Sequence, residues 1–281
     1  HILGQIDEDN KGISGIEKFF DHELKSSEDP IQLTLDTNIQ YLIRDELLFS
    51  EKIFNNVGSA AILMDINNGE ILSMLSMPDF DLNKREKITD KNYINRATKA
   101  IYELGSVFKT FTFTAGLNEN LIDVDTEFKN LEKRIRCGKN IISEYDEEIP
   151  ENITAEEILV RSGNIGSVRI AQKIGIEKFK SFLDKLGITE KIDFDIEEVG
   201  SPLPLTWGKC KLATSSFGHG ITTTALQLTK AYAIISNGGY LVKPTLIKQE
   251  NFDKSKNNKI LNEGISSPVS YTHLTLPTSR S

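Results

Sequence analysis

The sequence has few cysteines, few histidines and a single tryptophan, and it contains no long hydrophobic run. Its two cysteines, Cys137 and Cys210, are too few for a disulfide framework and lack the spacing of a metal site, so we interpret them as unpaired thiols. The four histidines are scattered, and none pairs with a serine in a recognisable pattern. No stretch of about 18 apolar residues occurs, so we expect no membrane-spanning helix within these residues, and no signal peptide is visible.

Basic residues are outnumbered by acidic ones. Lysine and arginine total 33 against 41 aspartates and glutamates, which gives a formal net charge of −8. Proteins that bind nucleic acid need clustered basic side chains to contact the phosphates, so no nucleic-acid partner is expected. With 281 residues and 38% hydrophobic residues, the chain can bury the core of one large globular domain with an attached fragment.

Two short motifs could carry chemistry. Ser106 and Lys109 form an S-x-x-K motif, and an S-x-N motif follows at Ser162–Asn164. A serine becomes nucleophilic when a base accepts its proton, and lysine can be that base if its pKa is lowered by burial or nearby positive charge. Gly105 suits the start of a helix, where free backbone N–H groups stabilise an oxyanion. The two motifs together predict an enzyme that forms an acyl-serine without histidine.

The local pattern around the S-x-x-K motif leaves two conformations open. In a helix, residues three apart share a face, so Ser106 and Lys109 could meet. However, residues 110–114 alternate threonine and phenylalanine, which read alone is typical of a strand, and a strand would turn the two side chains to opposite faces. A lone S-x-x-K is also compatible with an ordinary serine beside a lysine whose amine reaches solvent.

Several secondary-structure elements have clear signals. A short strand is predicted over 31–35, followed by a helix capped by Asp36 or Thr37. Residues 60–65 and 70–76 read as a hairpin, because Asn67-Asn68-Gly69 supplies the positive φ angles of a tight turn. Further helices are predicted after a capping box at 154–157 and over 165–173, 177–186 and 222–236.

The context of the motifs resembles a known family. Asn95–Thr98 followed by Tyr102–Lys109 is similar to the active-site stretch of class B penicillin-binding proteins, and most similar to the division-specific peptidoglycan transpeptidases. Residues 12–17 resemble the end of that family's N-terminal pedestal domain, and 58–74 resemble the first two strands of its transpeptidase domain. Residues 216–220, with 226–228, match another family stretch, so the resemblance covers residues 1 to about 267.

The resemblance implies a fold and a domain organisation. The fold is the α+β serine acyltransferase fold of transpeptidases and β-lactamases, in which helices flank an antiparallel sheet, here incomplete at the C-terminus. Residues 1–30 would end the pedestal domain, and 31–267 would form a partial transpeptidase domain. Residues 268–281 have neither helical periodicity nor caps, and they are interpreted as a non-native tail.

The resemblance also implies roles for individual residues. Ser106 would be the acylated nucleophile, Lys109 its general base, and Ser162 the relay of a proton to the leaving D-alanine. Asn164 would hold the lysine and a substrate amide, and the Ser106 N–H would be half of the oxyanion hole. The residues expected to contact substrate are Gly105, Ser106, Asn164, Gly218 and Gly220.

The substrates and partners implied are peptidoglycan stem peptides, β-lactam antibiotics, and division-complex membrane proteins including a lipid II polymerase. The protein would sit in the bacterial cytoplasmic membrane with its catalytic domain in the periplasm. No metal or organic cofactor is implied. His219 is interpreted as part of a glycine-rich turn, residues 146–148 as a solvated loop, and Trp207 as a packing residue.

One departure from the family is important. No K-T-G or K-S-G motif occurs in the sequence, so the second oxyanion donor and the clamp for the substrate carboxylate are missing from these residues. We therefore expect these 281 residues to be acylated poorly or not at all, and so to be inactive by themselves. Two alternatives remain open at this point. The first is a hydrolase of the same fold, either a β-lactamase or a D-alanine carboxypeptidase. The second is a non-catalytic scaffold or sensor that only binds β-lactams.

Overall fold

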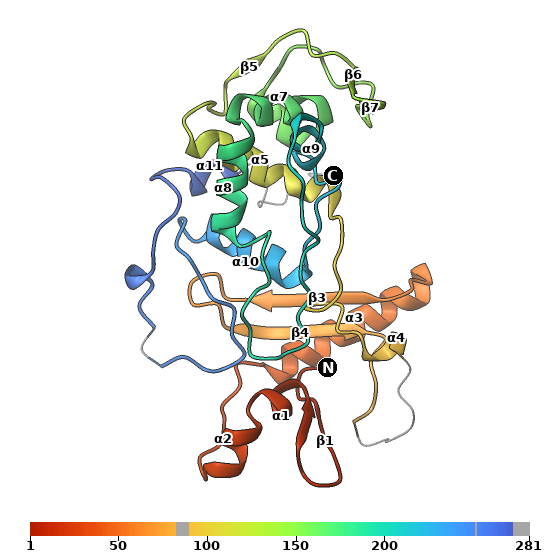
Figure 1. Cartoon of the computed structure of the whole chain (residues 1–281), viewed down its shortest axis with the longest axis vertical. Coiled ribbons are helices and arrows are strands. Elements are labelled where there is room, and N and C mark those ends of the chain that lie inside the picture. Colours follow the sequence, from red (N-terminus) through yellow and green to blue (C-terminus); the bar gives the residue numbers. More distant parts are fainter. Residues whose placement is uncertain (83–89, 251, 272–281) are drawn as a thin grey trace, which may run out of the picture.

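A helical part lies above a small antiparallel sheet (Figure 1), and the computed structural model describes residues 1–82, 90–250 and 252–271. The strands are β1 (Gln5–Ile6), β2 (Gly12–Ser14), β3 (Ser59–Met64), β4 (Ile71–Met77), β5 (Glu127–Phe128), β6 (Arg134–Cys137), β7 (Asn140–Ser143) and β8 (Ile153–Thr154). The helices are α1 (Gly15–Phe19), α2 (Asp21–Ser26), α3 (Thr37–Phe54), α4 (Asp90–Tyr93), α5 (Lys109–Asn118), α6 (Ala155–Val160), α7 (Asn164–Ile174), α8 (Ile176–Leu186), α9 (Lys209–Ser215), α10 (Ala225–Ser236) and α11 (Ser266–Val269), with 3₁₀ turns η1 (Gly105–Phe108) and η2 (Lys254–Lys256).

The predicted hairpin is confirmed as β3 and β4, which pair antiparallel from Ser59 opposite Met77 to Met64 opposite Ile71. Gly69 closes the turn with φ 80°, and a side chain there would also strike the carbonyl of Lys243 at 2.2 Å. Helix α3 lies against one face of this sheet, and α10 with the rest of the helical part lies against the other (Figure 1). This layering is the predicted α+β arrangement.

Helix α3 begins where the sequence predicts. The carboxylate of Asp36 accepts hydrogen bonds from the backbone N–H groups of Asn38 and Ile39, at 2.9 and 3.1 Å. Further along the helix, the Gln40 side chain donates to the carbonyl of Met74 in β4 and so fixes the helix to the sheet.

The strand predicted over 31–35 is wrong. Only Leu33 forms a β-bridge, to Ile247, and the Thr34 N–H donates to the carbonyl of Leu246. Residues 31–35 do alternate in polarity, but the segment around Leu246 and Ile247 that lies beside them is irregular. It pairs with them only at this bridge.

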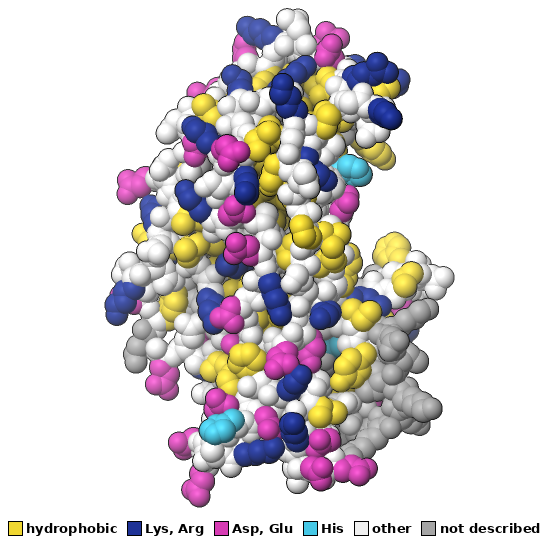
Figure 2. Space-filling view, viewed as in Figure 1, with side chains coloured by type: hydrophobic (Ala, Val, Ile, Leu, Met, Phe, Trp, Pro, Cys, Tyr) yellow, Lys and Arg dark blue, Asp and Glu magenta, His cyan; other side chains and the backbone are white. Residues whose placement is uncertain are grey.

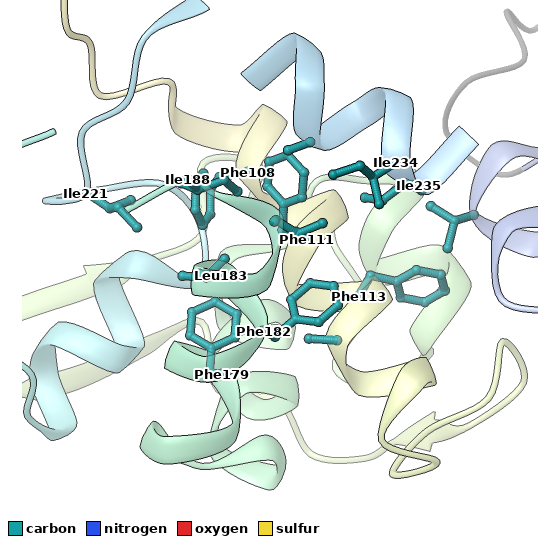
Figure 3. Packing of buried hydrophobic residues seen from close by; sticks show 14 of the residues in the cluster. Phe108, Phe111, Phe113, Phe179, Phe182, Leu183, Ile188, Ile221, Ile234 and Ile235 are labelled. Atoms are coloured by element: carbon teal, nitrogen blue, oxygen red, sulfur yellow. The ribbon is translucent and has the colours of Figure 1, made fainter. Parts of the chain in front are cut away.

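The core of the helical part is built on α5, which the sequence pattern alone could not assign. Nine consecutive residues, Lys109–Leu117, are buried, because other helices surround α5. A helix buried on every side needs no amphipathic period, which explains how alternating threonine and phenylalanine fit. The threonine hydroxyls are satisfied; Thr112, for example, donates to the carbonyl of Ser216 at 2.7 Å. Figure 3 shows the aromatic and aliphatic side chains of η1, α5, α8 and α10 packed together.

The domain limits predicted near residues 30 and 267 can be compared with the structure at both ends of the chain. Residues 1–30 form β1, β2, α1 and α2 below the sheet (Figure 1), and the Gly15 N–H donates to Glu198 of the main domain. The boundary predicted between 267 and 268 falls inside α11, whose Val269 is buried. Residues 272–281 lie outside the described part, so the domain limits stay predictions.

The described residues include no helix that is both long enough and apolar enough to cross a membrane. On the face shown in Figure 2, basic and acidic side chains are interspersed.

Candidate active site

The segment that carries Ser106 and Lys109 is helical. Residues 105–108 form the 3₁₀ turn η1, and Lys109 begins α5, so the winding that the catalytic hypothesis requires is confirmed. Gly105 enters the turn with φ 60°. The Ser106 side chain is exposed at the cleft, whereas Lys109 is only 2% exposed. The nucleophile candidate is therefore exposed and the base candidate buried. A hydrogen bond between their side chains is not among those of the described residues, so their contact stays a prediction.

Ser162 holds the amine of Lys109. The Lys109 Nζ donates to the Ser162 carbonyl at 2.5 Å and to the Ser162 Oγ at 2.9 Å. Burial lowers the pKa of Lys109 from 10.5 to about 8, against an opposing effect of the Glu144 carboxylate. At neutral pH this raises the neutral fraction of the amine roughly 300-fold over an ordinary lysine. The arrangement provides a base next to a hydroxyl that could carry a proton onward.

The conformation of Ser162 makes both contacts possible. Helix α6, opened by the predicted capping box at Thr154, ends in a Schellman motif: the Ser162 N–H donates to Leu159 and the Gly163 N–H to Ile158. Ser162 occupies the left-handed position of this motif with φ 56°, where glycine is usual. The tight reversal places its carbonyl and its hydroxyl on the side of Lys109.

Asn164 begins α7 and is anchored from outside the S-x-N motif. Its side-chain amide donates to the carbonyl of Ser143 at 2.9 Å, and its backbone N–H donates to Glu144 at 2.6 Å. The contact between Asn164 and Lys109 expected from the family resemblance is not among the hydrogen bonds of the described residues, so it stays a prediction.

A cleft of about 350 Å³ brings the two motifs to one place. It also contains the predicted substrate residues Gly105 and Gly218, whereas Gly220 lies just beyond it. The lining residues are Glu103, Gly105, Ser106, Tyr145, Asp146, Arg161, Ser162, Asn164, Phe217, Gly218 and His219.

Gly218 packs directly on the turn that holds the nucleophile. A side chain there would lie 2.1 Å from the carbonyl of Gly105, and φ is 80°. Beside it, the Gly220 N–H donates to Glu103 at 2.9 Å, and the His219 Nδ1 lies 3.3 Å from the same carboxylate. His219 thus belongs to the glycine-rich segment of the cleft wall, where it contacts Glu103 and stacks on the Phe217 ring.

The back of the nucleophile turn is supported by α10. The Tyr232 hydroxyl donates to the carbonyl of Val107 at 2.7 Å and lies 3.0 Å from the Thr110 Oγ1. Burial raises the pKa of Tyr232, so the phenol stays protonated as a donor. Trp207 packs edge to face on Phe179, away from this cleft, as a packing residue.

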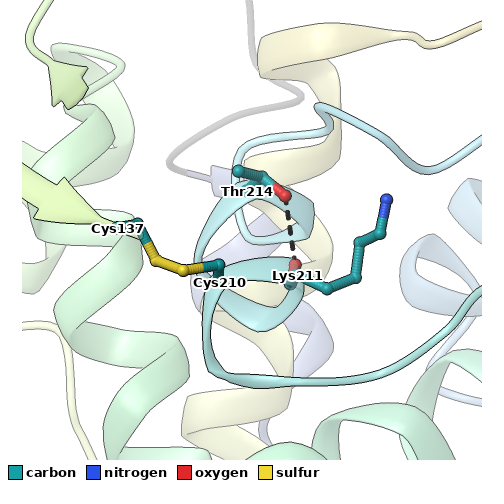
Figure 4. The surroundings of a disulfide bond; sticks show 4 residues. All are labelled: Cys137, Cys210, Lys211 and Thr214. Atoms are coloured by element: carbon teal, nitrogen blue, oxygen red, sulfur yellow. Dashed lines mark hydrogen bonds between the residues drawn. A yellow bond between two sulfur atoms is a disulfide. The ribbon is translucent and has the colours of Figure 1, made fainter. Parts of the chain in front are cut away.

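The prediction of two unpaired thiols is wrong. Cys137 and Cys210 form a disulfide with a Cα–Cα distance of 5.4 Å (Figure 4). The β6–β7 hairpin folds over α9 and brings together positions 73 residues apart, which no local spacing could indicate. The disulfide joins the hairpin that leads to Ser143 with the helix that leads to Gly218. No cluster of three or more histidine, cysteine or acidic side chains suited to a metal occurs in the described residues.

Two residues of this site were missed by sequence reasoning. Glu144 anchors the start of α7, and Tyr232 supports η1, but neither belongs to a motif or a regular spacing. Only the folded arrangement identifies them.

Comparison with known proteins agrees with this geometry. Residues 59–275 match the family described as penicillin binding protein transpeptidase domain. The chain is 30% identical over 274 residues to the "Probable peptidoglycan D,D-transpeptidase FtsI" of Caulobacter vibrioides, covering 96% of this chain and 46% of that protein. It is 28% identical over 287 residues to the stage V sporulation protein D of Bacillus subtilis, covering 89% and 43%.

The chain therefore spans about half the length of the curated relatives it matches. Among solved structures, penicillin binding protein 3 from Mycobacterium tuberculosis, complexed with aztreonam, superposes with a TM-score of 0.83 at 21% identity, covering 96% of this chain and 65% of that one. That likeness shows the fold. With the family match over more than half of its residues, the chain belongs to the penicillin binding protein transpeptidase domain family.

Proposed function

We propose that this chain is part of a peptidoglycan D,D-transpeptidase of septal cell-wall synthesis, which cross-links stem peptides through an acyl-serine and is acylated by penicillins. The observation that carries the proposal is the buried amine of Lys109, hydrogen-bonded to Ser162 and three residues from the exposed Ser106. The name of the relative from Caulobacter supports the same activity.

In the acylation step, the Ser106 Oγ attacks the carbonyl carbon of the bond between the two terminal D-alanines. Neutral Lys109 accepts the hydroxyl proton, and the backbone N–H of Ser106 stabilises the oxyanion at the positive end of α5. The C–N bond then breaks, and the departing amine receives a proton from Lys109 through the Ser162 Oγ, which lies 2.9 Å from the lysine Nζ. The products are free D-alanine and an ester on Ser106.

In the second step, the amine of a neighbouring stem peptide attacks this ester. Lys109, neutral again, accepts the amine proton and returns a proton to the Ser106 Oγ as the C–O bond breaks. A peptide cross-link forms and the serine is regenerated. Asn164 contributes its side-chain amide to positioning the substrate backbone, as the family resemblance implies.

The acylation rate expected for these residues is low, because the K-T-G or K-S-G motif that would supply the second oxyanion donor does not occur in them. One lost oxyanion donor typically slows acylation by about 10²–10³. We therefore expect slow but site-specific acylation of this chain.

The compartment and partners follow from the same proposal. The Cys137–Cys210 disulfide fits the oxidising periplasm, where such bonds persist. There the protein meets stem peptides and β-lactams, and it acts with division-complex membrane proteins, including a lipid II polymerase, from a cytoplasmic-membrane anchor.

Prolonged incubation with a fluorescent penicillin, followed by peptide mass spectrometry, tests the proposal. A long-lived adduct on Ser106 that is lost in Ser106→Ala is expected. Rapid release of hydrolysed penicillin would favour a hydrolase. An adduct elsewhere, or none at saturating penicillin, would overturn the assignment of Ser106.

A further inference from the structure

Glu144 lies immediately after β7, outside both motifs, yet its carboxylate reaches the start of α7. Its Oε2 accepts from the Asn164 N–H at 2.6 Å, and its Oε1 accepts from the Ile165 N–H at 2.8 Å. The residue at the N-cap of α7 is Gly163, which has no side chain to accept these bonds. The carboxylate of Glu144, which follows β7, therefore caps α7, the helix that begins at Asn164 of the S-x-N motif.

The same carboxylate affects Lys109. Glu144 is the charged group that opposes the effect of burial on the lysine, and so keeps its pKa from falling further. Other charged or titratable groups lie on the cleft wall and on the elements packed around it. They are Glu103 and His219 across the cleft, Tyr145 and Asp146 after Glu144, Arg161 before Ser162, Lys211 from α9 and Tyr232 from α10.

We infer that Glu144 is a positioning residue of the transpeptidation site: it holds the start of α7 and so fixes the Ser162–Asn164 turn that contacts the Lys109 amine, and its negative charge acts on that amine. The role of Glu144 in transpeptidation rests on the proposed function. Its cap on α7 and its effect on Lys109 do not depend on that function. Glu144 is not among the residues that line the cleft, so we infer that it acts through the turn and through its charge near Lys109.

The β6–β7 hairpin gives Glu144 its fixed place. At one end the hairpin is tied to α9 by the Cys137–Cys210 disulfide, and at the other the Glu144 N–H donates to the carbonyl of Lys133 at 3.2 Å. The hairpin thus presents Ser143 and Glu144 together to Asn164, one to its side chain and one to its backbone.

The test compares Glu144→Gln, which removes the charge but keeps one acceptor oxygen, with Glu144→Ala, which removes both. Glu157→Gln is the matched control, because Glu157 also accepts a backbone N–H at a helix start, that of Thr154 at α6. The pH dependence of Lys109 acetylation by acetic anhydride, followed by peptide mass spectrometry, reports the lysine pKa without any catalytic step.

We expect both Glu144 variants to titrate Lys109 at lower pH than the parent chain, while Glu157→Gln titrates it unchanged. We also expect penicillin labelling of Ser106 to have a pH profile displaced downward in Glu144→Gln, and to slow by about 10- to 100-fold in Glu144→Ala as the turn loosens. A Lys109 titration that is the same in all four proteins would overturn the inference.

The two proposals fail in distinguishable ways. If Ser106 of the parent chain is never labelled, the function is wrong, but the Lys109 titration still tests Glu144. If the Glu144 variants do not fold, amide exchange in the parent chain decides: rapid exchange at Asn164 and Ile165 would show that the carboxylate does not hold them.

Discussion

Replacing Lys109 with methionine should remove a stability cost that the site imposes on the fold. Lys109 is 2% exposed, and burial lowers its pKa from 10.5 to about 8. Each pKa unit corresponds to about 1.4 kcal/mol, so keeping the ammonium in this place costs the native state about 3 kcal/mol at neutral pH. Methionine has a similar length and carries no charge.

The pH dependence is the decisive signature. Below pH 8 both the native and the unfolded lysine are protonated, so the parent chain carries the full cost. Between about pH 8 and 10.5 the unfolded state binds more protons than the native state, so the stability of the parent chain rises with pH. Relative to Lys109→Met, it should gain about 3 kcal/mol across that range. All other titrations are common to both proteins and cancel in the difference.

Urea unfolding of both proteins at intervals from pH 6.5 to 10.5 measures this difference. Penicillin labelling of Ser106, followed in parallel, should be lost in Lys109→Met at every pH. Two free-energy profiles that stay parallel from pH 8 to 10.5 would refute the argument, since the lysine would then titrate alike in both states.

Three further predictions concern the architecture around the site. Changing Cys137 and Cys210 together to serine should lower the free energy of unfolding by about 4 kcal/mol in urea titrations, because the disulfide closes a loop with a separation of 73 residues; equal stability with and without dithiothreitol in the parent chain would contradict this. Gly218→Ala should destabilise the fold by about 1–3 kcal/mol and abolish Ser106 labelling, because its methyl group would lie 2.1 Å from the Gly105 carbonyl at φ 80°. Gly163→Ala should change thermal stability by less than about 0.5 kcal/mol, because φ is −67° and the nearest atoms are 3.7 Å away; a loss above 1 kcal/mol would show that the cap by Glu144 needs a bare N-cap.

The elements that the sequence predicted well have local chemical signals. Asp36 caps α3, Gly69 closes the β3–β4 hairpin, and Thr154 opens α6, each through groups within a few residues. The S-x-x-K and S-x-N motifs lie far apart in the sequence, but the fold brings them together: Ser106 and Ser162 line one cleft, and the Lys109 amine donates to Ser162.

What the sequence could not predict depends on distant partners. The alternation in residues 110–114 left α5 undecided, because the burial that favours its helix comes from elements far along the chain. The Cys137–Cys210 disulfide and the cap provided by Glu144 both depend on where the β6–β7 hairpin lands. No spacing within a segment encodes these pairings.

The conformations that cost free energy are concentrated around this cleft. Lys109 is a buried amine, Ser162 is a non-glycine residue in a left-handed conformation, and Gly218 allows two backbones to approach too closely for any side chain. Replacing Lys109 or Ser162 would remove the buried charge or the left-handed conformation, whereas any side chain at Gly218 would clash with the carbonyl of Gly105. The aromatic core around α5 and the Cys137–Cys210 disulfide provide the opposing stability. The fold thus holds these groups in positions that they would not adopt unaided, and the proposed acyl-transfer function requires such preorganisation.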